Sequence, residues 1–211
     1  MKETIKEIFI DLCSKYSSNE KIFRGYWNEI EKSYSHRSRH YHNLIHLENM
    51  IMELSSVQND IEDFDSVLFS IFYHDFIYKS TSKDNEEKSA EYAKSKLRKL
   101  NYNDVSIDKV YNQILATKSH QLSNQKDTNY LLDSDLSILG KSWNEYELYI
   151  KQIRKEYSIY PDFIYNSGRK KVLKHFLTFD RIYKTEYFKD KYEKQARENI
   201  SKEIELLWYY S

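Results

Sequence analysis

The amino-acid sequence predicts an all-α protein, and three observations support this fold class. The chain has 211 residues with only three glycines and one proline, which leaves little material for the tight turns of β-hairpins. No run of alternating apolar and polar residues is long enough to suggest a sheet. Apolar residues instead recur at intervals of three and four along segment after segment, which is typical of amphipathic helices.

The first half of the chain is expected to form five helices. Their approximate ranges are 3–17, 19–34, 42–56, 62–79 and 85–100. The helical spacing is clearest at Ile5, Ile8 and Leu12 and at Ala90, Ala93, Leu97 and Leu100. Cys13 lies among the apolar residues of the first helix, so we expect it to be a small core residue.

The second half is expected to form five more helices, near 104–118, 128–139, 143–157, 162–179 and 186–209. Gly140 directly follows the segment LLDSDLSIL, where a glycine commonly ends a helix. Pro161 fits the first turn of the helix that comes after it, because that position needs no backbone N–H. No repeat, low-complexity tract or long linker divides the chain, so residues 1–211 are expected to form a single domain.

Composition excludes several classes of protein. A single cysteine permits no disulfide framework, which suits a reducing compartment. The N-terminal segment lacks the uninterrupted apolar core of a secretory signal. The longest apolar stretch, FDSVLFSIFYHDFIY, is short for a membrane span and carries charged residues. A cytoplasmic protein without a membrane partner is therefore expected.

Charge patterning gives no indication of a nucleic-acid partner. The formal net charge is zero, and lysine and glutamate alternate along the predicted helices without a basic stripe. Proteins that bind DNA or RNA usually carry such a stripe. The sequence does not determine the oligomeric state.

The segment RHYHNLIHLENM holds three of the seven histidines of the chain. On the expected helix 42–56, Leu44, Leu47 and Ile51 form an apolar stripe, while His42 and His46 fall on roughly the opposite side. Two interpretations are open. The histidines are either exposed to solvent or line a polar cleft behind the core-facing stripe.

The expected helix 62–79 is apolar nearly all round, yet it contains the adjacent pair His74 and Asp75. A buried carboxylate needs a partner, because an unpaired buried charge costs several kcal/mol. A structural hydrogen-bonded His–Asp pair and a metal site are both consistent with this pattern.

Asp133 and Asp135 interrupt a third apolar segment, and residues two apart on a helix point about 200° apart. We therefore expect only one of them to face the same cleft as the histidines. Two imidazoles and two carboxylates suit a first-row divalent metal with positions left for water and substrate. This donor set does not distinguish Mn, Mg, Fe, Zn or Ni.

These motifs resemble those of the HD superfamily of metal-dependent phosphohydrolases, helical proteins in which a His, a His–Asp doublet and a distant Asp converge on a metal. The corresponding residues here are His46, His74, Asp75 and Asp135, with Asp133 as the alternative to Asp135. The sequence also resembles a small branch of predicted HD-superfamily phosphohydrolases of about this length. The similar segments are RHYHNLIH at 39–46, FYHDFIY at 72–78, DNEEKSA at 84–90, LLDSDLSILG at 131–140, IRKEY at 153–157, GRKKVL at 168–173 and ARENI at 196–200.

Two shorter segments, YHNLIH at 41–46 and SDLS at 134–137, are also similar to motifs of the cyclic-nucleotide phosphodiesterases. The resemblance implies that His42 is the general acid, that His46 binds metal and that Asp135 is favoured over Asp133. Alternatively, His42 could orient the ligand His46 without taking part in proton transfer. The further histidine and the purine-gripping glutamine region of those enzymes have no counterpart here, so cyclic-nucleotide cleavage is not expected.

Other polar residues have both a structural and a functional interpretation. Glu86 and Glu87 suit the first turn of a helix for which Asp84 is the expected N-cap and Asn85 a weaker candidate; either glutamate could also orient the attacking water or hold a second ion. His120 is either a surface residue or a ligand of a second metal. Arg154, Arg169 and Lys170 are either ordinary charges on helix surfaces or contacts for a substrate phosphate.

The function expected from the sequence is hydrolysis of a phosphate ester of a small metabolite or nucleotide by metal-activated water. A metal-binding HD-type protein that regulates or scaffolds without turnover is the first alternative. A metal-dependent oxygenase is the second, since His and Asp ligands on a helical scaffold also serve di-iron chemistry.

Overall fold

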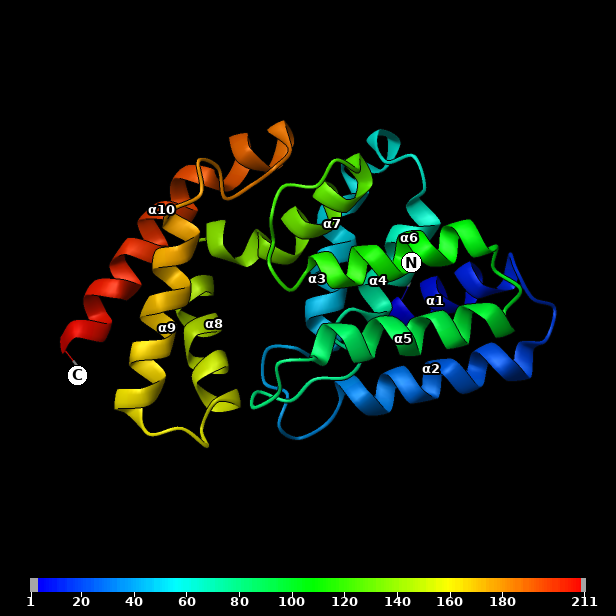
Figure 1. The fold of residues 1–211 in the computed structure, drawn as a ribbon, viewed down its shortest axis with the longest axis horizontal. Coiled ribbons are helices and arrows are strands. Elements are labelled where there is room, and N and C mark those ends of the chain that lie inside the picture. Colours follow the sequence, from blue (N-terminus) through cyan, green and yellow to red (C-terminus); the bar gives the residue numbers. More distant parts are fainter. Residues whose placement is uncertain (1–3, 210–211) are drawn as a thin grey trace. The chain divides into compact units, whose positions relative to one another are not determined.

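The computed structural model describes residues 4–209, and this part of the chain is all-helical without a β-strand, which confirms the predicted fold class (Figure 1). Over the same residues, no helix combines the length and the apolar character needed to cross a membrane. The chain forms two compact units, the first ending at Leu131 and the second beginning at Leu132. A single domain over residues 1–211 stays a prediction.

The helices of the first unit are α1 (Ile5–Ser14), α2 (Glu20–Tyr34), α3 (Leu44–Ser55), the 3-10 helix η1 (Gln58–Asp60), α4 (Phe64–Tyr73), α5 (Asn85–Lys99) and α6 (Asp104–Ala116). The boundary between the units falls within α7 (Lys126–Asp135). The second unit continues with the 3-10 helix η2 (Leu136–Gly140), α8 (Trp143–Glu156), α9 (Asp162–Leu177) and α10 (Glu186–Tyr209).

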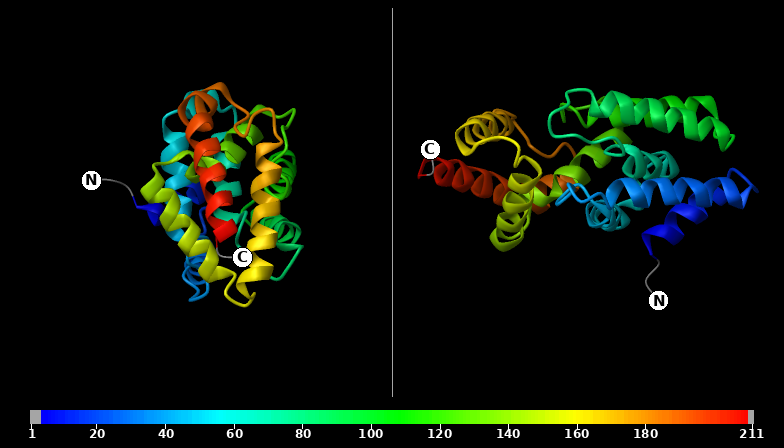
Figure 2. Two further views of the ribbon diagram at one scale, coloured as in Figure 1. Left: turned by 90° about the vertical axis from the view of Figure 1, so that its left-hand side faces the viewer. Right: turned by 90° about the horizontal axis from the view of Figure 1, so that it is seen from below.

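Helix α4 is the centre of the first unit and contacts α1, α3, α5 and α6. All of its residues from Ser66 to Tyr73 are buried. Phe9 of α1 meets Phe72 of α4 edge to face, with ring centroids 4.9 Å apart. Cys13 is fully buried beside them, as predicted for a core residue, and burial raises the pKa of its thiol to about 12. The amphipathic helices therefore cover α4, and α5 and α6 lie side by side on it (Figure 2).

Two of the differences between predicted and observed helix boundaries concern the histidines. Helix α3 begins at Leu44, because Asn43 has extended backbone angles and caps the helix, so His42 precedes the helix. Helix α4 ends at Tyr73 and does not reach residue 79. It ends where the amide of Phe76 turns back to the carbonyl of Tyr73, at 3.1 Å, so His74 and Asp75 form a tight turn after the helix.

The second unit packs η2 against α8 and α10, and α9 against α10 (Figure 2). The predicted helix 128–139 is divided into α7 and η2, and Gly140 is the last residue of η2. Asn199 of α10 donates from its side chain to the carbonyls of Leu139 and Lys141, at 2.8 Å each. Pro161 lies one residue before the first residue of α9.

Gly140 lies against the backbone of Tyr192 in α10. A Cβ atom at position 140 would lie 2.8 Å from the carbonyl oxygen of Tyr192 and 2.9 Å from its Cα. Because a backbone cannot move as a flexible side chain does, α10 would have to shift. The glycine is required by this close approach and not by its backbone angles, since no glycine in the described part of the chain has a positive φ.

We expect Gly140→Ala to lower the free energy of unfolding by about 1–3 kcal/mol, the usual cost of overpacking a close contact. Gly25→Ala is the matched control, because a Cβ there meets no atom within 4 Å. That control should stabilise helix α2 by about 0.5–1 kcal/mol. Urea unfolding of the three proteins measures both values, and equal stability of Gly140→Ala and wild type would contradict the packing described.

Candidate metal centre

His46 is positioned by the turn that begins α3. The Asn43 side chain accepts from the amide of Ile45 at 2.9 Å and donates to the carbonyl of His40 at 2.9 Å, which holds the turn before the helix closed. His46 follows in the first helical turn and is only 3% exposed. Its burial excludes the interpretation that His46 is a solvent-exposed histidine.

His74 and Asp75 are positioned by the end of α4. The amide of His74 makes the last helical hydrogen bond, to Ser70, and its imidazole Nδ1 lies 2.9 Å from the carbonyl oxygen of Ile71. A carbonyl oxygen only accepts, so Nδ1 carries the hydrogen and donates. In the neutral ring, Nε2 then carries a lone pair and acts as an acceptor. His74 is 1% exposed, and the side chain of Asp75 is 14% exposed.

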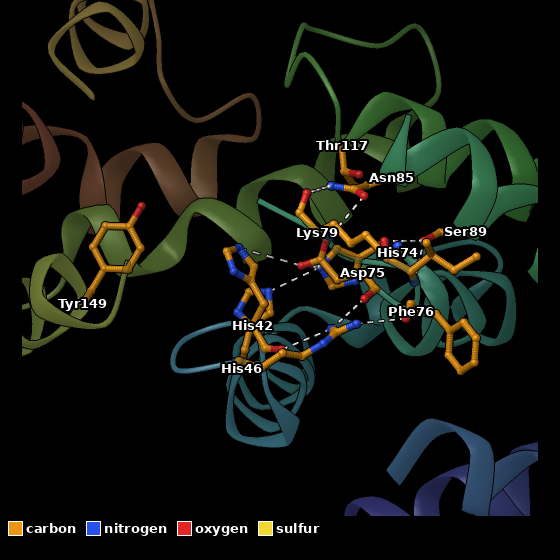
Figure 3. A network of polar contacts seen from close by, with 12 residues as sticks. His42, His46, His74, Asp75, Phe76, Lys79, Asn85, Ser89, Thr117 and Tyr149 are labelled. Carbon is orange, nitrogen blue, oxygen red and sulfur yellow. Dashed lines mark hydrogen bonds and ion pairs between the residues drawn. The ribbon is translucent and has the colours of Figure 1, made fainter. Parts of the chain in front are cut away.

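These three side chains converge on one point (Figure 3). The Nε2 atoms of His46 and His74 lie 3.3 Å apart, and Nε2 of His74 lies 3.1 Å from Oδ2 of Asp75. One donor atom from each residue lies within 4.8 Å of the other two, and no other group of three or more potential ligands of this kind occurs in the described part of the chain. The structure therefore brings these three predicted residues together, and their role as metal ligands stays a prediction.

The donor set fits a divalent metal ion. Ligand atoms about 2.0–2.2 Å from one ion, at the angles of tetrahedral or octahedral coordination, lie roughly 3.0–3.5 Å from one another. The two separations of 3.3 and 3.1 Å fall in that range. The hydrogen bond from Nδ1 of His74 to a backbone carbonyl is also the usual support of a metal-binding histidine, because it fixes the tautomer.

His42 lies beside this cluster in the turn before α3. Its Nε2 is 3.9 Å from Oδ2 of Asp75, which is ion-pair distance but too long for a hydrogen bond. Its ring packs against Tyr78, with centroids 4.3 Å apart. His42 and His46 are not stacked along one helix as predicted, yet their rings remain 5.9 Å apart. The pair is brought together by the turn and not by helical periodicity.

The segment after Asp75 is held by two residues that the sequence analysis did not assign to the site. Ser89 of α5 accepts from the amide of Ile77 at 3.0 Å, and Asn85 bonds both the amide and the carbonyl of Lys79, at 3.1 and 3.0 Å. Both are buried, with Ser89 fully so, and Figure 3 shows the two side chains beside Lys79. Small polar residues on the buried face of an otherwise charged helix are the sequence signal that could have found them.

Glu86, Glu87 and His120 are not part of the cluster of three. Glu87 forms an ion pair with Lys118 at the end of α6. Asp84 occupies the N-cap position of α5, as predicted, but its side chain bonds Ser82 and Lys88 and no helix amide. His120 has a left-handed backbone with φ of 51°, in the turn after α6. A catalytic role for either glutamate and a second metal at His120 stay predictions.

Asp133 and Asp135 belong to the second unit, and their environments differ. Asp133 is fully buried, and its carboxylate accepts from the amides of Lys184 and Thr185 and from the Thr185 hydroxyl, at 2.7–3.0 Å. It anchors the segment that leads into α10. Asp135, the last residue of α7, is partly exposed. Of the two residues, Asp135 is the more exposed, and its choice over Asp133 as a metal ligand stays a prediction.

The three predicted phosphate contacts also lie in the second unit. Arg154 pairs with Asp162 at 2.7 Å and donates to the carbonyls of Tyr157 and Tyr160, joining α8 to α9. Arg169 is buried against Glu203, at 2.7 Å. Both guanidinium groups therefore have structural partners, which a phosphate would have to displace. Lys170 is half-buried, and phosphate binding by all three stays a prediction.

Lys184 is a buried cation that the sequence analysis missed. Its side chain is 3% exposed, its Nζ donates to the carbonyl of Ile182 at 2.6 Å, and it lies 4.0 Å from Oδ1 of Asp133. Burial lowers the pKa of Lys184 to about 8, although Asp133 and Asp135 act in the opposite direction. Burial likewise raises the pKa of Asp133. Desolvation thus dominates for both members of this pair.

The buried lysine predicts a pH dependence of stability. Between about pH 8 and pH 10.5, its ordinary pKa, the unfolded chain keeps a proton on Lys184 that the folded chain has lost. The free energy of unfolding should therefore rise with pH in this window relative to Lys184→Met. Urea unfolding at pH 7 and pH 10 measures the difference, with the exposed Lys21→Met as control. The free energy of unfolding of wild type minus that of Lys184→Met should differ between the two pH values. An equal difference at both would contradict the burial of Lys184.

No family model, no curated protein and no solved structure matches this chain. The relationship to the HD superfamily that the motifs suggest accordingly stays a prediction.

Proposed function

We propose that this protein is a metal-dependent hydrolase of phosphate esters of small metabolites or nucleotides. His46, His74 and Asp75 would hold a divalent metal ion, and the resemblance of the sequence motifs implies Asp135 as a fourth ligand. The proposal rests on the geometry of the first three residues and on the resemblance of their motifs to the HD superfamily.

One observation carries the proposal. With Nδ1 of His74 committed to the carbonyl of Ile71, the lone pair of a neutral Nε2 faces a carboxylate oxygen 3.1 Å away. Two lone pairs at that distance repel unless a positive charge lies between them. A proton would suffice for His74 and Asp75 alone. A metal ion accounts in addition for the Nε2 of His46, which comes from another helix and points to the same place.

When bound, a divalent ion supplies an acidified water as nucleophile and polarises a phosphoryl oxygen. The protein residues supply the rest. Asp75 contributes a negative charge that balances the ion, and the carbonyl of Ile71 accepts from Nδ1 of His74, which fixes the tautomer in which Nε2 would be the ligand atom. The burial of His46 and His74 excludes bulk water and strengthens the electrostatic interactions in the cluster.

His42 is the residue suited to protonate the leaving oxygen. It lies outside the group of three ligands but within 3.9 Å of Asp75, and its side chain is 19% exposed, so substrate can reach it. Packing against Tyr78 fixes the plane of its ring. A proton donated from Nε2 of His42 would neutralise the alkoxide that leaves as the phosphate ester breaks.

The proposal predicts that His46→Ala and His42→Ala fail differently. His46→Ala should lose the metal and all turnover. His42→Ala should keep the metal and lose about 10²–10⁴ in turnover, the range that a general acid contributes. This loss should shrink for a nitrophenyl phosphate, whose leaving group needs no proton. Metal content by elemental analysis and phosphate release from natural and nitrophenyl esters measure the contrast.

His36→Ala is the control, because it also removes one histidine of the first unit but from an exposed position. It should change neither metal content nor turnover. Equal slowing of both ester classes by His42→Ala would mean that His42 positions the site and donates no proton. Metal without release of phosphate from any ester would favour a regulatory or scaffold protein, and bound iron with oxygen consumption would favour an oxygenase.

A further inference from the structure

Arg39, the first residue of the RHYHNLIH segment, joins two turns of the candidate centre. Its Nη1 donates to the carbonyl of Asp75 at 2.7 Å and to that of His42 at 3.2 Å. Its Nη2 donates to the carbonyl of Phe76 at 2.9 Å and to Oγ of Ser33 at 3.0 Å. One guanidinium group thus holds the turn of His42 and the turn of Asp75 together.

The hydroxyl of Ser33 completes this arrangement from the end of α2, since it donates to the carbonyl of Phe76 at 2.5 Å. The four oxygens that accept from Arg39 are therefore three backbone carbonyls and one serine hydroxyl. Carbonyls left over at a helix end attract a cation, and α4 ends at this place. Arg39 supplies the donors that the peptide groups after α4 lack.

The charge of Arg39 is buried, with the residue only 9% exposed. Its guanidinium carbon lies 4.7 Å from the ring centre of Tyr34 and 5.5 Å from that of Tyr78. Tyr78 is also the ring that packs on His42. A planar group with several fixed donors and a polarisable face suits these contacts, whereas a lysine has one compact ammonium and cannot reach all four oxygens together.

We propose that Arg39 is a positioning residue that sets the spacing between His42 and the metal ligands His74 and Asp75. This inference rests on the proposed function, because the spacing matters only if the cluster binds a metal. Arg39 acts through the backbone of Asp75 and His42, and its side chain contacts neither the ion nor the substrate.

The test uses Co²⁺, whose visible absorption spectrum reports the geometry of its ligands. Arg39→Met should weaken Co²⁺ binding by about 10- to 100-fold, as loss of supporting contacts commonly does. It should also change the spectrum of the bound ion. Arg39→Lys should fall between wild type and Arg39→Met. Titration followed by absorption spectroscopy measures affinity and spectrum in one experiment.

Arg197→Met is the matched control. Arg197 also donates to backbone carbonyls, those of Phe179 and Asp180 at 2.7 and 3.1 Å, but in the second unit. Its loss should lower stability without altering the Co²⁺ spectrum. If Arg39 only stabilised the fold, Arg39→Met would likewise be less stable, but its folded fraction would bind Co²⁺ with the affinity and spectrum of wild type. An unchanged affinity and spectrum in Arg39→Met would thus overturn the proposal.

Ser33→Ala and Arg39→Lys decide the matter if Arg39→Met does not fold. Ser33→Ala removes one neutral anchor of the guanidinium and should weaken Co²⁺ binding in the same direction by a smaller factor. Wild-type behaviour of both variants would overturn the positioning role while leaving the proposed function intact. Failure of wild type to bind Co²⁺ would instead refute the metal centre, and the role of Arg39 with it.

Discussion

The end of helix α4 is the constraint on which the candidate centre depends. This helix is buried from Ser66 to Tyr73, and the backbone that turns away after it needs hydrogen-bond partners in place of the helical ones. Arg39 donates to the carbonyls of Asp75 and Phe76. Ser89 and Asn85 accept from the amides of Ile77 and Lys79 further along the segment. These partners fix a sharp turn, and the turn carries His74 and Asp75.

A fixed turn at this position has a chemical consequence. Nδ1 of His74 donates to the carbonyl of Ile71 in α4, so the imidazole ring has one orientation and one tautomer. The first turn of α3 then brings His46 to the same point, with Asn43 as its cap. The backbone hydrogen bonds that the fold requires therefore also hold in place the side chains that would bind a metal.

The sequence predicted the fold class, nearly every helix and the meeting of His46 with His74 and Asp75, because apolar spacing and short motifs are local signals. It did not predict the end of α4, since the apolar pattern continues through Phe76 and Ile77 while the backbone turns away. That turn depends on Arg39, which is distant in sequence from the carbonyls that it binds. The roles of Asn85, Ser89 and Lys184 were also missed. Helical periodicity shows which face of a helix is buried, but it does not show which backbone group or carboxylate lies opposite each side chain.

The most direct test of the metal centre is a crystal structure of the protein grown with Mn²⁺ or Co²⁺, with anomalous scattering used to locate the ion. The account predicts one strong anomalous peak about 2.0–2.3 Å from Nε2 of His46, Nε2 of His74 and a carboxylate oxygen of Asp75. The same map would identify the fourth protein ligand. A map without a peak at this point, with His74 hydrogen-bonded directly to Asp75, would contradict the account and leave the pair as a structural element of the first unit.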